Sequence, residues 1–105
     1  MTRYAWIIDK DHLADGGELR RDDAGKRGGN DPGGVLAGRL AAGEGEKFRM
    51  FDDDGELYYS GRLLAIDDLG APEPGGLEPL DDFGLPNAGC TSIHYQQADG
   101  TWKEV

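Results

Sequence analysis

The chain has 105 residues, of which 37% are hydrophobic and 18 are glycine, and its formal net charge is -10. This length predicts one small domain over residues 1–105, with a modest core. The negative charge argues against free nucleic acid and anionic membranes as direct ligands, because their phosphate groups would be repelled.

The sequence contains no apolar run of the length, about 18 residues, that a membrane span needs. The apolar stretch near the N-terminus is also too short for a signal peptide. The single cysteine, Cys90, excludes an intramolecular disulfide. Together these features favour a reducing, cytoplasmic location.

Residues 3–9 alternate loosely between two sets of apolar side chains and predict a first strand. Residues 10–34 are polar and rich in glycine, and we predict a long loop there. Four basic residues concentrate in this loop: Arg20, Arg21, Lys26 and Arg27. They could form an anion site, but solvated side chains or an interaction with the acidic part of the chain account for them more simply.

Asp31 and Pro32 predict the start of a short helix, because aspartate caps helices and proline suits the first helical position. A weak apolar face follows, formed by Val35, Leu36 and Leu40. We expect Gly43 to end this helix, which would lie against one face of a sheet.

The densest apolar and aromatic content lies in residues 47–66, which we predict to form a β-hairpin. Asp54-Gly55 lies between its two arms and is a strong turn signal, since glycine takes a positive φ without steric cost. Gly61, inside the second arm, indicates a bulge or a close approach of another backbone.

Two registers of this hairpin are open. A two-residue turn would place Met50 opposite Tyr59, whereas a three-residue loop with a bulge would place Phe51 opposite Leu57. A slip of one residue exchanges the two faces of a strand. We favour the three-residue loop, because the two-residue turn would set two acids directly opposite each other beside further acids.

Residues 67–82 contain three prolines and three glycines and predict a second long loop. Residues 81–89 predict a turn-rich connection with one helical turn. The last two strands are expected at residues 91–96 and 101–105, joined by a turn at residues 98–100. In the first of them, alternation sets Ile93 and Tyr95 on one face, and His94 and Gln96 on the other.

These elements predict an α+β fold. It would contain a mainly antiparallel sheet of about five strands, curled or partly closed, with one short helix packed on it. The excess acid falls on one part of the chain: residues 44–82 hold twelve acids against three bases, a net charge of -9. Residues 1–43 are net neutral, and residues 83–105 carry -1.

No group of reactive side chains has the pattern of a known chemistry. The consecutive aspartates at residues 52–54 lack the alternating spacing of a calcium loop, and adjacent strand residues point to opposite faces. Cys90 with His12 or His94 could in principle form an activated thiolate, but a buried structural cysteine is the commoner role. We therefore predict no catalytic residues, no metal site and no cofactor.

Two phrases, FRMFDDDGELYYSGR (residues 48–62) and PLDDFGLPNAGCT (residues 79–91), resemble those of small acidic uncharacterised proteins of actinobacterial phages and plasmids. The resemblance implies an origin on a mobile element and transfers no site residue. It also suggests the role of an inhibitor of host nucleic-acid-binding machinery, including restriction and CRISPR effectors.

The leading hypothesis is a non-enzymatic acidic binding protein that docks on a basic surface of a host nucleic-acid-binding protein and blocks it, as a nucleic-acid mimic. Its acidic face would be built from Asp52, Asp53, Asp54, Glu56, Asp67 and Asp68. Apolar anchors would come from Tyr58, Tyr59 and Phe51.

The alternative is a structural or regulatory interaction module whose acidity serves only solubility. Its working surface would be an apolar patch, such as a homodimer face around the strands of Trp6 or Trp102, and pairing of sheet edges between protomers would be natural.

Overall fold

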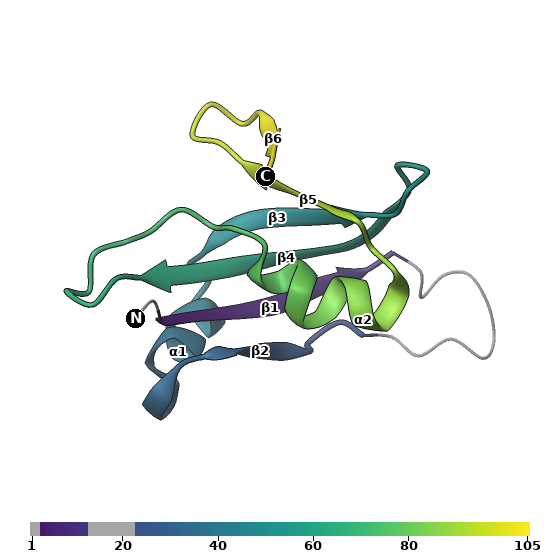
Figure 1. Cartoon of the computed structure of the whole chain (residues 1–105). Helices are drawn as coiled ribbons and strands as arrows, with labels where there is room; N and C mark the ends of the chain where they lie inside the picture. Colours follow the sequence, from purple (N-terminus) through teal and green to yellow (C-terminus); the bar gives the residue numbers. More distant parts are fainter. Residues whose placement is uncertain (1–2, 13–22) are drawn as a thin grey trace.

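The structure, a computed structural model, describes residues 3–12 and 23–105. This part of the chain holds six strands: β1 (Arg3–Asp11), β2 (Arg27–Asn30), β3 (Glu46–Phe51), β4 (Leu57–Ile66), β5 (Ser92–Gln96) and β6 (Trp102–Glu104). All pair antiparallel, in the order β2-β1-β4-β3-β5-β6 (Figure 1). The predicted α+β class is confirmed. The sheet has six strands where about five were predicted, and it is not closed.

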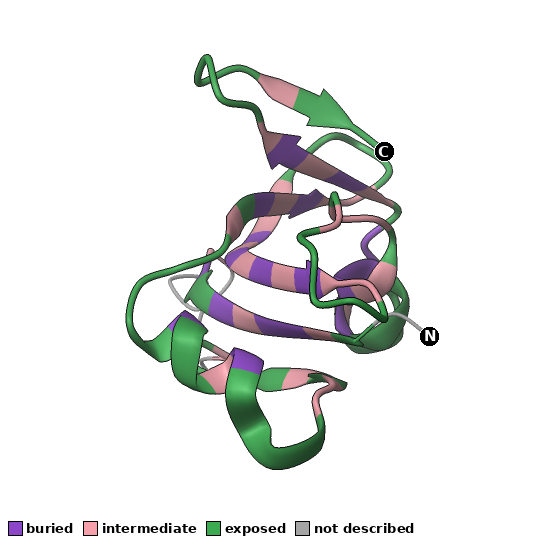
Figure 2. Cartoon of the chain, turned by 90° about the vertical axis from the view of Figure 1, so that its left-hand side faces the viewer, coloured by how far each residue is buried: buried purple, intermediate pink, exposed green. Residues whose placement is uncertain are grey.

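Short helical elements connect the strands: the 3-10 helix η2 (Pro32–Gly34), α1 (Val35–Ala41), the π-helical turn η3 (Leu80–Gly84) and α2 (Leu85–Ala88). The sheet lies between α1 on one face and the η3–α2 segment on the other (Figure 2). We call these two sides the α1 face and the core face. One short helix was predicted, and it corresponds to α1 packed on the sheet. Within the described ranges, none of the helices is long and apolar enough to cross a membrane.

The main core lies on the core face, where alternate residues of β1, β3, β4 and β5 are buried (Figure 2). Leu80, Phe83 and Cys90 close this core from the helical side. The centroid of the Phe83 ring lies 5.3 Å from that of Trp6 and 5.1 Å from that of Tyr59. On the α1 face a smaller buried cluster is formed by Ala5, Leu36 and Leu40.

The strand β2 corrects the prediction of a continuous loop over residues 10–34. Its sequence R-G-G-N has no apolar alternation, yet it pairs along β1. A Cβ atom on Gly28 would lie 2.8 Å from Cε2 of Trp6, so the missing side chain leaves room for the indole. Tertiary pairing thus selects this strand against local propensity. Of the predicted basic cluster, Lys26 and Arg27 are exposed at its start, while Arg20 and Arg21 lie outside the described residues.

Asp31 caps α1, but it lies further before the helix in the sequence than predicted. Pro32 starts η2 rather than α1, and the Asp31 carboxylate accepts hydrogen bonds from the backbone N–H groups of Leu36 (3.0 Å) and Ala37 (2.9 Å). α1 ends at Ala41, and Gly43 follows it with a φ of 95°. Both ends of the predicted helix are therefore close to those observed.

The β3–β4 hairpin combines the two registers considered above. Met50 lies opposite Tyr59, and after a register shift Phe51 lies opposite Leu57. The extra residue is Tyr58, which forms a bulge inside β4. The favoured loop is thus confirmed, and the remainder of the hairpin follows the other register.

Gly61 lies at a close approach of other atoms, as predicted. A Cβ atom there would collide with the carbonyl oxygen of Ile7 in β1 and lie 2.6 Å from Cζ of Phe48. β1 itself runs two residues beyond its predicted end, and its pairing with β4 shifts between Ile8 and Lys10. The glycine therefore lets β1 and the Phe48 ring approach β4.

The second long loop is shorter than predicted, because η3 begins at Leu80, inside residues 67–82. The helical segment continues through α2, so the single turn predicted for residues 81–89 is an underestimate. β5 and β6 lie within the ranges predicted for them. Ile93 and Tyr95 are buried, whereas His94 and Gln96 are partly exposed on the opposite face, as the alternation predicted.

Candidate functional site

The strongest local concentration of charge is the tip of the β3–β4 hairpin. We call residues 52–56 (Asp52, Asp53, Asp54, Gly55 and Glu56) the acidic turn. One oxygen of Asp52, Oδ1, accepts hydrogen bonds from the N–H groups of Asp54 (2.9 Å) and Glu56 (2.8 Å). The Asp52 N–H donates to the Glu56 carbonyl (3.0 Å), and the Gly55 N–H donates to the Asp52 carbonyl (3.1 Å). With φ of 80° at Gly55, these bonds hold the turn in one shape.

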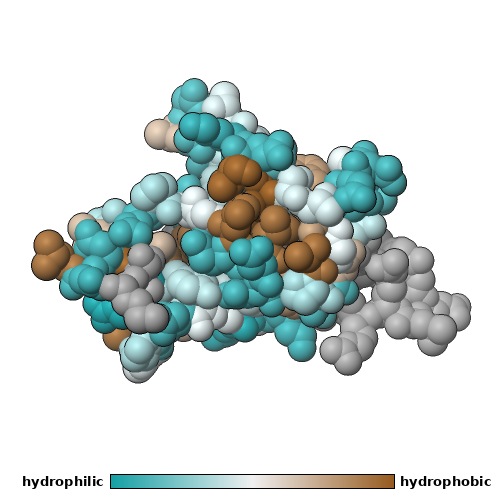
Figure 3. All heavy atoms as spheres, in the orientation of Figure 1, coloured by the Kyte–Doolittle hydropathy of each residue, from teal (hydrophilic) through white to brown (hydrophobic). Residues whose placement is uncertain are grey.

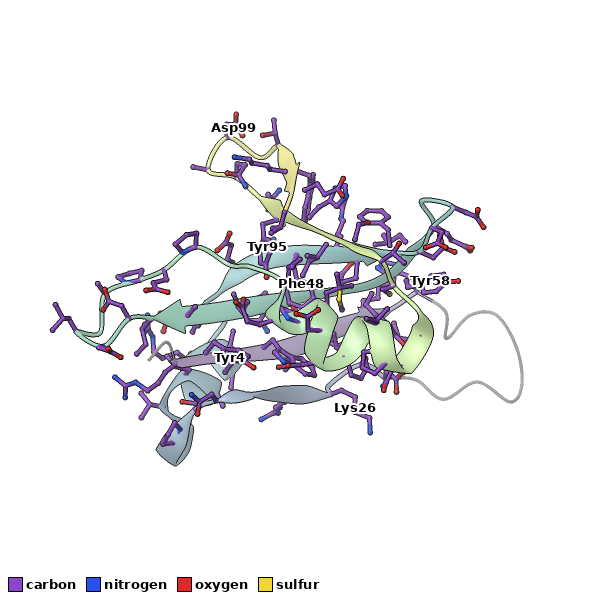
Figure 4. The ribbon with its side chains drawn as sticks, viewed as in Figure 1. Tyr4, Lys26, Phe48, Tyr58, Tyr95 and Asp99 are labelled. Carbon is purple, nitrogen blue, oxygen red and sulfur yellow. The ribbon has the colours of Figure 1, made fainter. Side chains whose placement is uncertain are left out.

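Asp52 is held in its charged form by hydrogen bonds. Backbone N–H donation, above all from Glu56, lowers the pKa of Asp52, and the Tyr58 hydroxyl also donates to this carboxylate. The same hydrogen bond raises the pKa of Tyr58, whose side chain lies beside the turn (Figure 4). In the part of the chain that the structure describes, none of the four carboxylates forms an ion pair.

Asp67 and Asp68 do not join this group. They belong to a second turn of similar geometry, in which the Asp67 carboxylate accepts hydrogen bonds from the N–H groups of Leu69 and Ala71, both 2.9 Å. The two turns lie at opposite ends of β4, whose ten residues span about 30 Å (Figure 1). The prediction of one acidic face that includes Asp67 and Asp68 is therefore wrong.

Of the three predicted anchors, Phe51 and Tyr58 are partly exposed, and Tyr58 is the one that donates a hydrogen bond to the acidic turn. Tyr59 is buried in the core, and its hydroxyl donates to Asp23 Oδ2 (3.0 Å). Phe51 lies on the α1 face, where its ring centroid is 4.6 Å from that of His94. The acidic turn and Tyr58 therefore make up the predicted site as the structure assembles it.

Cys90 and the two histidines are not brought together. Cys90 is fully buried on the core side, where desolvation raises the pKa of its thiol to about 12. His94 extends from the opposite face of the sheet, and His12 Nε2 lies 2.7 Å from Ser60 Oγ. Among residues 3–12 and 23–105, no three His, Cys, Asp or Glu side chains converge as metal ligands would.

The sheet edges bear on the alternative of strand pairing between protomers. β1, which carries Trp6, pairs on both sides, so it offers no free edge for strand pairing between protomers. β6, which carries Trp102, is an edge strand. Hydrophobic atoms gather over the core side (Figure 3). Three exposed apolar side chains belong to the segments on that side: Leu77, Leu85 and Val105.

A basic groove on the α1 face was not predicted. α1 packs on β1 and β4, and among the described elements no other helix covers that face over β3, β5 and β6. A groove of about 230 Å³ lies there, lined by Asp9, Lys47, Phe48, Arg49, Ser60, Gly61, Gln96 and Trp102. The alternation K-F-R-M-F in β3 was a usable signal, because buried Phe48 and Met50 set Lys47 and Arg49 on the other face.

The described geometry therefore offers two charged surfaces of opposite sign, the acidic turn and the basic groove. No family model matches the chain, and neither a curated protein nor a solved structure resembles it.

Proposed function

We propose that this protein is a non-enzymatic binding protein whose acidic turn docks on a basic surface of a protein partner. One observation carries the proposal: four carboxylates within five residues project from a hairpin tip in a shape fixed by their own backbone hydrogen bonds. A preformed array loses little conformational entropy on binding. Unneutralised charge also accelerates association with a basic partner.

The partner fits the class of host proteins that bind nucleic acid. The basic surfaces of such proteins accept phosphates, and an acidic hairpin seated there would exclude the nucleic acid by charge and bulk. The net charge of -9 within residues 44–82 supports this class. We place the activity in the cytoplasm, in keeping with the free Cys90 thiol.

Exposure guides which residues we assign to the contact. Asp53, Asp54 and Glu56 are exposed, whereas Asp52 has the structural task of closing the turn. Tyr58, partly exposed beside them, supplies the aromatic anchor. Asp67 and Asp68 lie at the far end of β4 and are not part of this contact.

The test is a capture experiment from nuclease-treated bacterial lysate with three baits. They are the wild type, Asp53/Asp54→Lys, and the control Asp68/Asp81→Lys. Each variant replaces two aspartates by lysine, and each replacement raises the charge by 2, so the net charge changes from -10 to -6 in both. Asp52 is left intact, so that the turn keeps its hydrogen bonds. The captured proteins are identified by mass spectrometry and their affinity is then measured in purified form at several salt concentrations.

The expected result is a nucleic-acid-binding protein captured by the wild type and the control and lost by Asp53/Asp54→Lys. Binding of the purified pair should weaken steeply with salt. The same proteins on all three baits, or salt-insensitive binding, would overturn the proposal. Equal losses in both variants would show that overall charge acts, and not the acidic turn.

A further inference from the structure

The open half of the α1 face carries positive charge in a chain that is otherwise strongly acidic. One row of paired residues crosses five strands in the order Lys10, Ser60, Arg49, His94 and Glu104. Beside it, Lys47 lies opposite Arg62. Counting Asp9 at the rim, four cations (Lys10, Lys47, Arg49, Arg62) face two carboxylates (Asp9, Glu104), a net charge of +2. The remainder of the chain then carries -12.

The two cations that line the groove, Lys47 and Arg49, have no acidic partner among the described residues. Arg62 is neutralised by Asp9, with Nε to Oδ2 at 2.7 Å and Nη2 to Oδ1 at 2.9 Å. Lys47 lies directly opposite Arg62, whose charge Asp9 already offsets. The positive charge that remains for a bound anion therefore comes from Lys47 and Arg49.

Arg49 is oriented for anion recognition. Its guanidinium carbon lies 4.0 Å from the centroid of the Trp102 ring, so one face of the group rests on the indole. A stacked guanidinium keeps its N–H edge available, and that fork matches two oxygens of a phosphate or carboxylate. Ser60 and Gln96 add a hydroxyl and an amide to the same groove.

We propose that this groove, between Lys47, Arg49, Ser60, Gln96 and Trp102, binds a phosphate monoester. Two unpaired cations complement a group that carries close to two negative charges at neutral pH. The volume of about 230 Å³ suits a single phosphate with its attached group. A polynucleotide is disfavoured, because the charge of -12 on the rest of the chain would repel its further phosphates. This groove lies apart from the acidic turn, so the inference stands independently of the proposed function.

The test is a titration of the purified protein followed by calorimetry and by NMR of the backbone amides. The probes are inorganic phosphate, free phosphoserine and adenosine monophosphate, which separate the possible sources of the phosphate. Dimethyl phosphate serves as a monoanionic control. Arg49→Gln is compared with Arg39→Gln, an equal change of charge on α1, where Arg39 pairs with Glu44 at 3.0 Å. Lys47→Gln is compared with Lys26→Gln in the same way.

We expect at least one monoester to bind, with amide shifts at Arg49, Ser60 and Gln96. Arg49→Gln should weaken its affinity about tenfold, and Arg39→Gln by less than about twofold. Dimethyl phosphate should bind about tenfold more weakly than the monoester. Circular dichroism of each variant separates a lost site from a lost fold.

Three results would overturn the proposal. The first is that no monoester binds the folded wild type at 20 mM. The second is that Arg39→Gln weakens binding as much as Arg49→Gln, which would indicate diffuse charge alone. The third is that a short oligonucleotide binds more tightly than any monoester with the same dependence on Arg49, which would assign the groove to a nucleic acid.

Discussion

The indole Nε1 of Trp6 donates a hydrogen bond of 3.1 Å to the carboxylate of Asp82, 76 residues away in the sequence. The same oxygen, Oδ2, accepts a bond of 2.8 Å from the Tyr4 hydroxyl. One carboxylate thus joins β1 to η3 beside the buried ring of Phe83. This connection holds the helical segment on the core face.

Replacing Asp82 should therefore destabilise the fold far more than replacing its neighbour. Asp82→Ala leaves the Trp6 donor without its partner, and we expect the free energy of unfolding to fall by about 1–3 kcal/mol. Asp81→Ala is the control, because Asp81 is exposed like Asp82 but its carboxylate accepts no hydrogen bond from the described residues, so its replacement should change stability by less than about 0.5 kcal/mol. Urea unfolding followed by Trp fluorescence measures both. Equal effects of the two substitutions would contradict the structural role of Asp82.

Local signals were sufficient for most of the sheet. The arms of the central hairpin carry aromatic and branched residues around Asp54-Gly55, and β5 alternates strictly, so both were predictable from short stretches. β2 was not, because nothing in R-G-G-N favours a strand. Its partner is an indole on another strand, and such tertiary contacts override local propensity.

The sequence predicted the acidic residues of the hairpin tip correctly as a group, but it wrongly added Asp67 and Asp68 to them. Counting charge over residues 44–82 does not show how far apart the acids lie. β4 is ten residues long, so it carries Asp52 and Asp67 to opposite ends of the sheet. The groove needed the strand order as well, since Arg49 and Trp102 come together only when β5 lies between β3 and β6.

A substitution at Gly28 tests whether packing against Trp6 stabilises β2, whose sequence does not favour a strand. Gly28→Ala should lower the free energy of unfolding by about 1–3 kcal/mol, because its Cβ would collide with the Trp6 ring. Gly38→Ala in α1 is the matched control, since the added Cβ meets no atom within 4 Å. That variant should gain about 0.5–1 kcal/mol from helix propensity. If Gly28→Ala also gained stability, the placement of β2 against Trp6 would be wrong.

The Cys90 thiol should be inert in the folded protein. Burial raises its pKa to about 12, so almost no thiolate is present at pH 8 and the sulfur is out of reach of solvent. A colorimetric thiol reagent should react at least about a hundredfold more slowly with the native protein than with the protein in 8 M urea. Fast reaction without denaturant would place Cys90 at the surface and reopen the question of thiolate chemistry.

The four tyrosines predict how the fold responds to alkaline pH. Desolvation by burial, together with the hydrogen bond to Asp82, raises the pKa of Tyr4 to about 12. Burial also raises the pKa of Tyr59 and of Tyr95 above the ordinary value, and donation to Asp52 raises that of Tyr58. In the unfolded chain all four ionise near pH 10.

The sign of the effect on stability follows from this difference. The folded state holds the phenol protons more tightly than the unfolded state, so the contribution is fully present below about pH 10 and is lost as pH rises above it. Urea unfolding should therefore give a constant free energy up to about pH 9.5 and a steep decline beyond. Absorbance at 295 nm should show tyrosinate appearing together with the loss of circular dichroism. Half of the tyrosinate forming near pH 10 in a protein that keeps its circular dichroism would mean that these hydroxyls are not buried as described.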